Sequence, residues 1–355
     1  AKRITLHDDR RLTEVRLDRF LRERVIPGVY PRRVPLTLSS WDAPGEPVTV
    51  QEALRQTFSP QEQGAPWGQP WSTKWLRVQG DVPDSWGSGA DTAVEILVDL
   101  GFNSDLPGFQ CEGTAWRADG SVIKAISPRN QYIPLKLLGS GMSVDFYVEA
   151  AANPDLSQGW TFAATPYGDK ATAGSEAQYR LGLIVIAELN QAVWELQQDI
   201  DALRGLMHEL PMELPRRHEI LRALERMLDV MDPDDVPGTA AAGRAALAEV
   251  LARPAYASAH QLVATGHAHI DSAWLWPVRE TIRKCARTFS NVVALMDEDP
   301  EFVFSCSSAQ QLAWMKEYYP ELFARIREKV KTGQFVPVGG MWVEADSNMP
   351  GGEAM

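Results

Sequence analysis

The sequence of 355 residues is poor in cysteine, since it contains only Cys111, Cys285 and Cys306. Their spacing fits neither a disulfide framework nor a zinc-binding knuckle. We therefore expect three buried free thiols, as is typical of a protein kept in a reducing compartment. The first residues also lack the apolar core of a signal peptide, so the sequence predicts a cytoplasmic location.

Positive charge is in deficit, with 35 Lys and Arg residues against 47 Asp and Glu residues and a formal net charge of −12. The phosphates of a nucleic acid would be repelled by such a surface, so no nucleic-acid partner is expected. Long hydrophobic runs are lacking too, because no stretch approaches the ~20 apolar residues of a membrane span. No membrane partner is expected, and the oligomeric state, including a homo-oligomer, stays open.

The composition is otherwise that of a globular protein, with 45% hydrophobic and 23% charged residues. The length suffices for two or three domains, each with its own core. Tryptophan is frequent, with 12 residues. Its flat faces suit sugar rings, although large cores and β-sandwiches also contain many tryptophans.

The first two segments are expected to be a short helical segment and a β domain. In residues 1–30, apolar side chains at helical spacing predict a short helix over 11–25, which Pro27, Gly28 and Pro31 are expected to end. Residues 31–170 contain several short alternating stretches and an Asp119-Gly120 turn. This pattern predicts an antiparallel β-sandwich of jelly-roll type.

The third segment, residues 171–258, is expected to be a helical linker. Apolar residues at helical spacing predict a long amphipathic helix from Leu181 to Met207. Two further helices are expected after it, separated by Pro233, Pro237 and Gly238. These helices are expected to connect the β-sandwich with the last domain.

Strands and helices alternate in the last segment, residues 259–355. Short apolar strands are expected near 261–266, 302–306 and 335–339, with helical stretches between them. Such a pattern is typical of right-handed βαβ units in a parallel sheet buried on both faces. Because three strands do not close a barrel of seven or eight, we expect this segment to be the start of an incomplete barrel in a fragment of a longer enzyme.

A metal-binding pattern directly follows the first of these strands. His267, His269 and Asp271 occupy alternate positions, and alternate residues of a strand point the same way. Two imidazoles and a carboxylate are ligands that zinc prefers. Either all three bind, or His269 and Asp271 bind while His267 orients them from behind.

A second acidic segment follows the third strand. Asp346 lies beyond its end, where catalytic groups of parallel α/β barrels are found. One cleft can therefore hold Asp346 and the metal-binding residues together. Glu344 and Glu353 are alternatives to Asp346 that we rank lower.

Two tryptophans follow the metal-binding pattern. Trp274 lies three residues beyond Asp271, where its ring can form the floor of a sugar site. The alternative is a tryptophan that packs in the core at the start of a helix. For Trp276 the core is the favoured interpretation.

Two motifs resemble a known family. The stretches GHAHIDSAWLWP, from Gly266, and GMWVEAD, from Gly340, resemble the two N-terminal signatures of glycoside hydrolase family 38, the class II α-mannosidases. The variants are similar to those of the cytosolic and vacuolar branch. The resemblance implies a catalytic domain of (β/α)7 type and a retaining exo-α-mannosidase that removes terminal α-mannose from oligosaccharides.

The resemblance also implies roles for individual residues. His269 and Asp271 match zinc ligands, for which Co²⁺ is an alternative metal. Asp346 matches the residue that both binds zinc and acts as nucleophile, and Trp274 matches the aromatic floor under the mannose ring. His267 falls outside the family's ligand set. The fourth ligand and the acid/base residue of the family lie beyond residue 355, so the chain alone is expected to be inactive.

Two other functions remain open. An amidohydrolase-like barrel also places a His-x-His pattern at an early strand, but such enzymes usually begin with the barrel. A non-catalytic carbohydrate-binding fragment, with the sandwich as its binding module, is the other alternative. The preceding β domain and the acidic segment at Glu344 and Asp346 favour the mannosidase.

Overall fold

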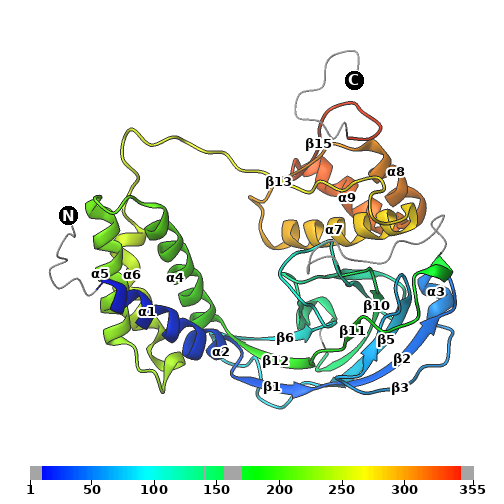
Figure 1. Cartoon of the computed structure of the whole chain (residues 1–355), viewed down its shortest axis with the longest axis horizontal. Helices are drawn as coiled ribbons and strands as arrows, with labels where there is room; N and C mark the ends of the chain where they lie inside the picture. The colour runs from blue at the N-terminus through cyan, green and yellow to red at the C-terminus, as the bar shows by residue number, and fades with distance from the viewer. Residues whose placement is uncertain (1–9, 140, 156–169, 345–355) are drawn as a thin grey trace. The chain divides into compact units, whose positions relative to one another are not determined.

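The computed structural model describes residues 10–139, 141–155 and 170–344 (Figure 1). The chain divides into two compact units. The first comprises 1–34, 83–95 and 186–261, and the second comprises 35–82, 96–185 and 262–355.

Helices with a shared apolar core make up most of the first unit. Val25, Val193, Leu224 and Leu247 are among the fully or nearly fully buried side chains of this core. The helical elements are α1 (Arg10–Phe20), a π-helical turn (Leu21–Val25), α2 (Ile26–Val29), α4 (Gln191–Glu209), α5 (Pro215–Val230) and α6 (Val236–Leu251). The expected helices at both ends of this unit are therefore present, although their limits differ.

The first helix runs beyond its expected limit at residue 25, although it stops before Pro31. The helical path continues through α2 as far as Val29. Pro27 lies two residues beyond the π-helical turn Leu21–Val25, so the helix has a local irregularity near the proline and does not end there.

The expected helix from Leu181 is also wrong over its first part. Ile184–Asn190 form strand β12, and Ile184, Val185 and Ile186 are buried. Branching at Cβ favours a strand at these three positions. Helix α4 begins only at Gln191, because the Asn190 side chain accepts a hydrogen bond from Val193 N at 3.0 Å.

An antiparallel six-stranded sheet in the order β3-β2-β5-β10-β7-β8 dominates the second unit. It confirms the expected antiparallel β domain. The strands of this sheet are β2 (Thr37–Ala43), β3 (Ser59–Gln61), β5 (Thr73–Asp81), β7 (Glu112–Trp116), β8 (Val122–Ile126) and β10 (Ser143–Ala151), and helix α3 is Val50–Ala53.

Two further sheets belong to the β region. One has the order β1-β12-β6-β9, and the other pairs β11 with β4. Their strands, besides β12, are β1 (Arg32–Pro35), β4 (Pro66–Trp67), β6 (Thr92–Val98), β9 (Tyr132–Pro134) and β11 (Tyr179–Arg180).

The predicted Asp119-Gly120 turn joins β7 to β8. Arg117 N donates to Ser121 O at 2.9 Å, which closes the hairpin. Gly120 has a φ of 86°, a left-handed conformation that glycine adopts without strain. The side chain of Asp119 accepts hydrogen bonds from the Ser121 amide and hydroxyl groups. The hairpin is therefore confirmed.

Three short parallel strands, β13 (Gly266–His267), β14 (Phe304–Cys306) and β15 (Phe335–Pro337), form the sheet of the last segment. They alternate with α7 (Val278–Glu298), α8 (Ala309–Tyr318) and α9 (Pro320–Thr332). Phe289, Phe304 and Phe335 form the centre of the core between the helices and the sheet. The expected parallel order of three strands and the intervening helices are confirmed, but the limits of the first strand are not.

The expected strand over 261–266 is wrong except at its last residue. Leu262 and Val263 are 91% and 95% exposed, and β13 contains only Gly266 and His267. The reason is the register, because Gly266 pairs with Phe304, the first residue of β14. No residue of β14 remains to pair with the apolar residues before Gly266.

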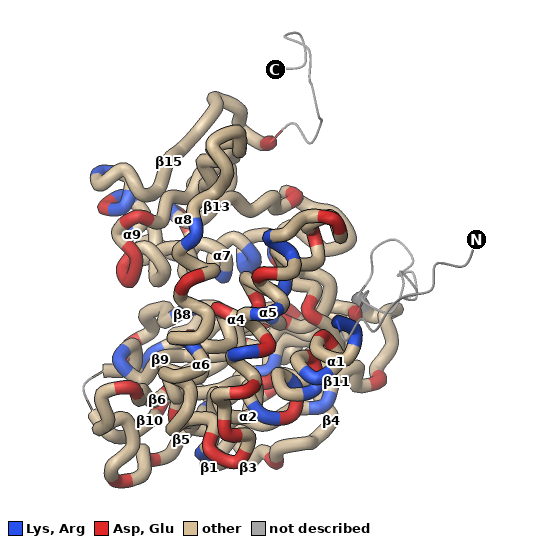
Figure 2. The backbone as a smooth tube through the Cα atoms, turned by 90° about the vertical axis from the view of Figure 1, so that its left-hand side faces the viewer, with Lys and Arg blue, Asp and Glu red and all other residues tan. Residues whose placement is uncertain are grey.

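Helix α7 lies between β13 and the antiparallel β domain in both views of the chain (Figures 1 and 2). A buried ionic network joins α7 to that domain. Arg287 Nη1 lies 2.6 Å from Glu112 Oε2 in β7 and 2.6 Å from Glu280 Oε1 in α7 itself. Lys284 Nζ lies 3.3 Å from Glu112 Oε1. The network therefore connects the α/β segment to the β domain within the second unit.

All three cysteines are buried and free, as the sequence predicted. Among the helices that the structure describes, none is sufficiently long and apolar to cross a bilayer.

Candidate metal site

The candidate metal site begins directly after β13. His269 Nε2 lies 3.2 Å from Asp271 Oδ1. The residue between them, Ile270, is buried in the core, and its carbonyl group accepts a hydrogen bond from Gln311 Nε2 at 3.1 Å. Anchoring Ile270 in this way leaves His269 and Asp271 partly exposed and close to one another.

Glu344 adds a second carboxylate to this pair. Its Oε1 lies 3.2 Å from His269 Nδ1, and its Oε2 accepts a hydrogen bond from Ser307 Oγ at 3.1 Å. Ser307 immediately follows β14, and Glu344 lies beyond β15. The carboxyl ends of all three parallel strands therefore contribute to one site.

The His267 side chain contacts strand β14 and not the other two predicted ligands. Its Nδ1 lies 2.9 Å from Ser305 O, and its Nε2 is 3.9 Å from Glu344 Oε2, beyond hydrogen-bond distance. His267 and His269 therefore share no hydrogen-bond partner among the described residues. His267 is instead hydrogen-bonded to the backbone of strand β14.

Opposing influences set the charge of the site. Partial burial alone would lower the pKa of His269, but its hydrogen bonds with Glu344 and Asp271 raise it. Burial alone would raise the pKa of Glu344, but its hydrogen bonds with His269 and Ser307 lower it. Because two carboxylates face one imidazole, the group keeps excess negative charge in either protonation state of His269, which favours a cation.

The structure describes some of the predicted site residues and not others. Asp346 and the alternative Glu353 lie outside the described residues. Trp274 is 47% exposed, and its ring makes edge-to-face contacts with Phe109 and Trp276 at centroid distances of 5.7 and 5.6 Å. Sequence reasoning missed Phe109, because it comes from the β domain and carries no local motif.

Trp276 is partly buried, and its Nε1 donates to Thr281 Oγ1 at 3.0 Å. Lys284 Nζ lies 4.7 Å from the centre of its ring, within the range of a cation–π contact. These contacts support the structural interpretation that we favoured for Trp276.

The spacing of the His269 and Asp271 donor atoms is close to that of two ligands on one zinc ion. With bonds of about 2.0–2.2 Å in a tetrahedron, two donor atoms lie roughly 3.3–3.6 Å apart. The distance between His269 Nε2 and Asp271 Oδ1 is 3.2 Å, just below this range. Within residues 10–139, 141–155 and 170–344, no group of three or more His, Cys, Asp or Glu side chains is arranged to hold a metal. The described residues thus present a donor pair rather than a full ligand set.

Comparison with known families matches two separate stretches of the chain. Residues 259–355 match the glycosyl hydrolases family 38 N-terminal domain. Residues 34–187 match the α-mannosidase jelly roll domain. Residues 259–355 are therefore similar to the N-terminal domain of glycoside hydrolase family 38. The resemblance based on the two family 38 motifs is confirmed, and the antiparallel β domain is a jelly-roll domain.

The individual relatives are α-mannosidases by name. Alpha-mannosidase 2C1 from Homo sapiens is 37% identical over 324 residues, which cover 90% of this chain and 29% of the relative. Alpha-mannosidase G from Dictyostelium discoideum is 30% identical over 315 residues, covering 87% and 27%. An alpha-mannosidase from Saccharomyces cerevisiae is 29% identical over 306 residues, covering 82% and 26%. The chain thus spans less than a third of the length of these relatives.

Proposed function

We propose that an enzyme carrying this sequence is a zinc-dependent, retaining exo-α-mannosidase, which removes terminal α-mannose from oligosaccharides. The observation that carries the proposal is the 3.2 Å approach of His269 Nε2 to Asp271 Oδ1 at the end of β13. The α-mannosidase names of the relatives supply the reaction class.

In this proposal His269 and Asp271 hold Zn²⁺, or Co²⁺ in its place, together with Asp346. When bound, the metal polarises sugar hydroxyl groups and stabilises the positively charged transition state. Glu344 accepts a hydrogen bond from His269 Nδ1, which keeps the proton on that nitrogen and leaves Nε2 available as a ligand atom. His267 is held by Ser305 O and supports the site from behind.

The chain's own residues then account for half of a retaining mechanism. The Asp346 carboxylate attacks the anomeric carbon while a second carboxyl group protonates the departing glycosidic oxygen. Water later displaces the sugar from Asp346, and the second group takes the proton of that water. The exposed ring of Trp274, braced by Phe109 and Trp276, supports the sugar from below.

We further propose that β13, β14 and β15 are consecutive strands of a parallel barrel of (β/α)7 type. Their side-by-side parallel order and the position of the candidate site at their carboxyl ends support this. The three buried free thiols support a reducing, cytoplasmic location.

Hydrolysis of nitrophenyl α-mannoside by an enzyme carrying this sequence tests the proposal. We expect turnover that a chelator removes and zinc restores, and none with ester or amide substrates. Preferential amide hydrolysis would favour the amidohydrolase-like alternative. Glycan binding without turnover of any mannoside would favour the carbohydrate-binding alternative.

A further inference from the structure

Two aromatic rings flank the side chain of Trp274. Trp274 lies between β13 and α7, in a stretch without helix or strand, and it is 47% exposed. Phe109 and Trp276 contact its ring edge-to-face, with centroids 5.7 and 5.6 Å away and interplanar angles of 80° and 89°. Because regular backbone structure does not fix Trp274, the orientation of its ring depends on the side chains that pack against it.

One buried ammonium group contacts the supports of both flanking rings. Lys284 in α7 is 6% exposed, and its Nζ lies 4.7 Å from the centre of the Trp276 ring. The same Nζ donates to Gly108 O at 3.2 Å, in the residue that precedes Phe109. An aromatic face attracts a cation, and does so more strongly where water is excluded. Lys284 therefore connects Trp276 with the backbone next to Phe109.

Side-chain contacts also hold the loop that carries Phe109. Residues 99–111, between β6 and β7, contain no helix or strand. Within this loop, the buried Gln110 side chain donates from Nε2 to Leu106 O at 3.0 Å. That hydrogen bond stabilises the loop internally, whereas the hydrogen bond from Lys284 connects the loop to α7. The position of Phe109 beside the tryptophan therefore depends on Lys284.

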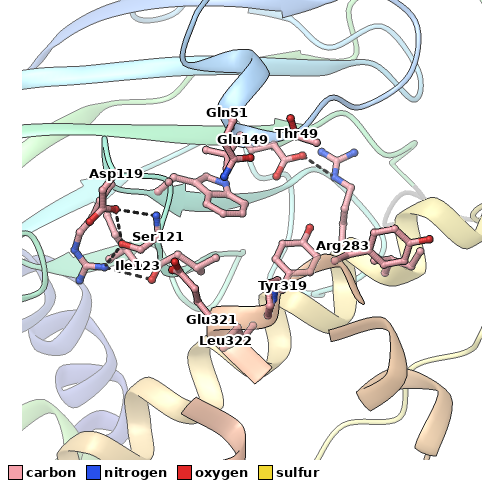
Figure 3. Close-up of a pocket in the computed structure, with 18 of the residues that line it drawn as sticks. Thr49, Gln51, Asp119, Ser121, Ile123, Glu149, Arg283, Tyr319, Glu321 and Leu322 are labelled. Atoms are coloured by element: carbon pink, nitrogen blue, oxygen red, sulfur yellow. Dashed lines mark hydrogen bonds and ion pairs between the residues drawn. The ribbon is translucent and has the colours of Figure 1, made fainter. Parts of the chain in front are cut away.

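Helix α7 has further ion pairs with the jelly-roll domain on either side of Lys284. Arg283 pairs with Glu149 of β10 at 3.0 Å, in the wall of a cavity of about 880 Å³ (Figure 3). Arg287 Nη1 lies 2.6 Å from Glu112 Oε2, so Glu112 keeps a cationic partner without Lys284. Removal of the Lys284 charge therefore leaves α7 paired with the domain. The contacts that are lost are those with the loop and the neighbouring tryptophan.

We propose that Lys284 and Phe109 are positioning residues of the sugar site, which hold the Trp274 ring in the orientation that supports a sugar. Lys284 acts through Trp276 and the Gly108 backbone, and Phe109 acts by direct ring contact. The inference rests on the proposed function, in which Trp274 lies under the mannose ring. It adds that a loop of the jelly-roll domain and helix α7 together fix this ring.

Fluorine NMR tests the positioning without substrate, in an enzyme that carries this sequence and is labelled with fluorotryptophan. Comparison with Trp274→Phe assigns the Trp274 signal. Lys284→Met keeps a long side chain but removes the charge, so it should shift and broaden that signal. Lys284→Arg keeps a cation that can stack on an aromatic ring, so it should move the signal less. An unmoved Trp274 signal in Lys284→Met, or equal changes in the two variants, would overturn the proposal.

A second pair of variants avoids the buried ionic network. Phe109→Ala removes one of the rings that flank Trp274, so the Trp274 signal should shift and broaden. Leu106→Ala is the matched control, because Leu106 lies in the same loop and is 48% exposed. It should leave the Trp274 signal in place. Equal changes in these two variants would refute the positioning even if Lys284→Met failed to fold.

Kinetics with nitrophenyl α-mannoside show whether the orientation of Trp274 matters for the sugar. Phe109→Ala and Lys284→Met should each raise KM by about five-fold, the value of one aromatic contact. The kcat should change by less than about two-fold, because stacking supports substrate and transition state alike. In a Trp274→Ala background the same changes should have little further effect, since both residues act through that ring.

Additive losses in that background, or a fall in kcat with KM unchanged, would contradict the positioning role. Absence of mannoside turnover in the unsubstituted enzyme would instead refute the proposed function. In that case the fluorine NMR signals still decide whether Lys284 and Phe109 hold the Trp274 ring.

Discussion

The guanidinium group of Arg287 in α7 lies 2.6 Å from the carboxylate of Glu112 in β7, and both side chains are buried. The two residues are 175 positions apart in the sequence. Their contact fixes the helix that follows the candidate metal site against the jelly-roll domain. Stability of this contact is therefore a condition for a well-formed site.

We expect Arg287→Ala to destabilise the second unit by about 3–5 kcal/mol, because it leaves Glu112 and Glu280 as buried charges that have lost a partner. Urea unfolding followed by tryptophan fluorescence measures the change. Asp145→Ala is the control, since it breaks an exposed pair with Arg77 and should cost no more than about 1 kcal/mol. Equal losses in the two variants would contradict the account.

Acid should weaken the same network. Burial alone would raise the pKa of Glu280, but Arg287, Arg283 and Lys284 lower it from 4.5 to about 2. A carboxylate with a depressed pKa contributes stability above its unfolded pKa, so this contribution is lost as the pH falls from about 4.5 to about 2. Urea midpoints measured across this range should fall steeply.

The control for the pH experiment is Glu280→Gln. This variant should be less stable at neutral pH, and its stability should depend less on pH between about 4.5 and 2. An unchanged slope would show that Glu280 does not carry the acid sensitivity.

Local patterns predicted part of this architecture and missed the rest for identifiable reasons. Helix α7 follows from its repeating apolar positions, and the antiparallel hairpin follows from Asp119-Gly120. The buried ionic network could not be predicted, because Arg287 and Lys284 have the pattern of an ordinary exposed helix face until Glu112 packs against them. Residues 184–190 were misassigned because their apolar side chains also fit helical spacing.

The candidate site shows the same division between local and distant information. His269 and Asp271 approach each other because they flank one buried residue, a relationship that two sequence positions are enough to predict. Ser307 and Phe109 meet the site only through the pairing of strands and the packing of domains. Glu344 was considered from its position after a strand but ranked below Asp346, which lies outside the described residues.

The boundary between β12 and α4 gives a stability test. Asn190→Ala removes the side-chain oxygen that accepts from Val193 N, and should cost about 1 kcal/mol, the usual value of such a cap. Asp201→Ala, at an exposed position within α4, should change the stability by less than about 0.5 kcal/mol. Thermal unfolding of both variants measures these changes in stability. Equal losses in the two variants would argue against the cap.

Metal affinity tests the role assigned to Glu344. Glu344→Ala removes the acceptor for His269 Nδ1, and loss of such a partner typically weakens metal binding by about 10–100-fold. Calorimetric titration with Zn²⁺, in an enzyme carrying this sequence and without substrate, measures the change. Ser307→Ala should have a smaller effect, because Ser307 contacts only Glu344 in this group. Unchanged zinc affinity in Glu344→Ala would remove Glu344 from the site.

Substitution of either His269 or Asp346 should abolish turnover, for different reasons. His269→Ala should lose both bound zinc and turnover of α-mannosides. Asp346→Ala should abolish turnover as well, since one side chain serves as nucleophile and as ligand in the proposed mechanism. Near-normal turnover in Asp346→Ala would contradict that assignment.

The most direct test of the retaining mannosidase is covalent trapping. An enzyme carrying this sequence is incubated with an activated fluoro-mannoside, which forms a glycosyl-enzyme faster than water removes it. Peptide mass spectrometry should then find the sugar attached to Asp346. Labelling of Glu344 instead, or steady hydrolysis without any covalent adduct, would contradict the proposed mechanism.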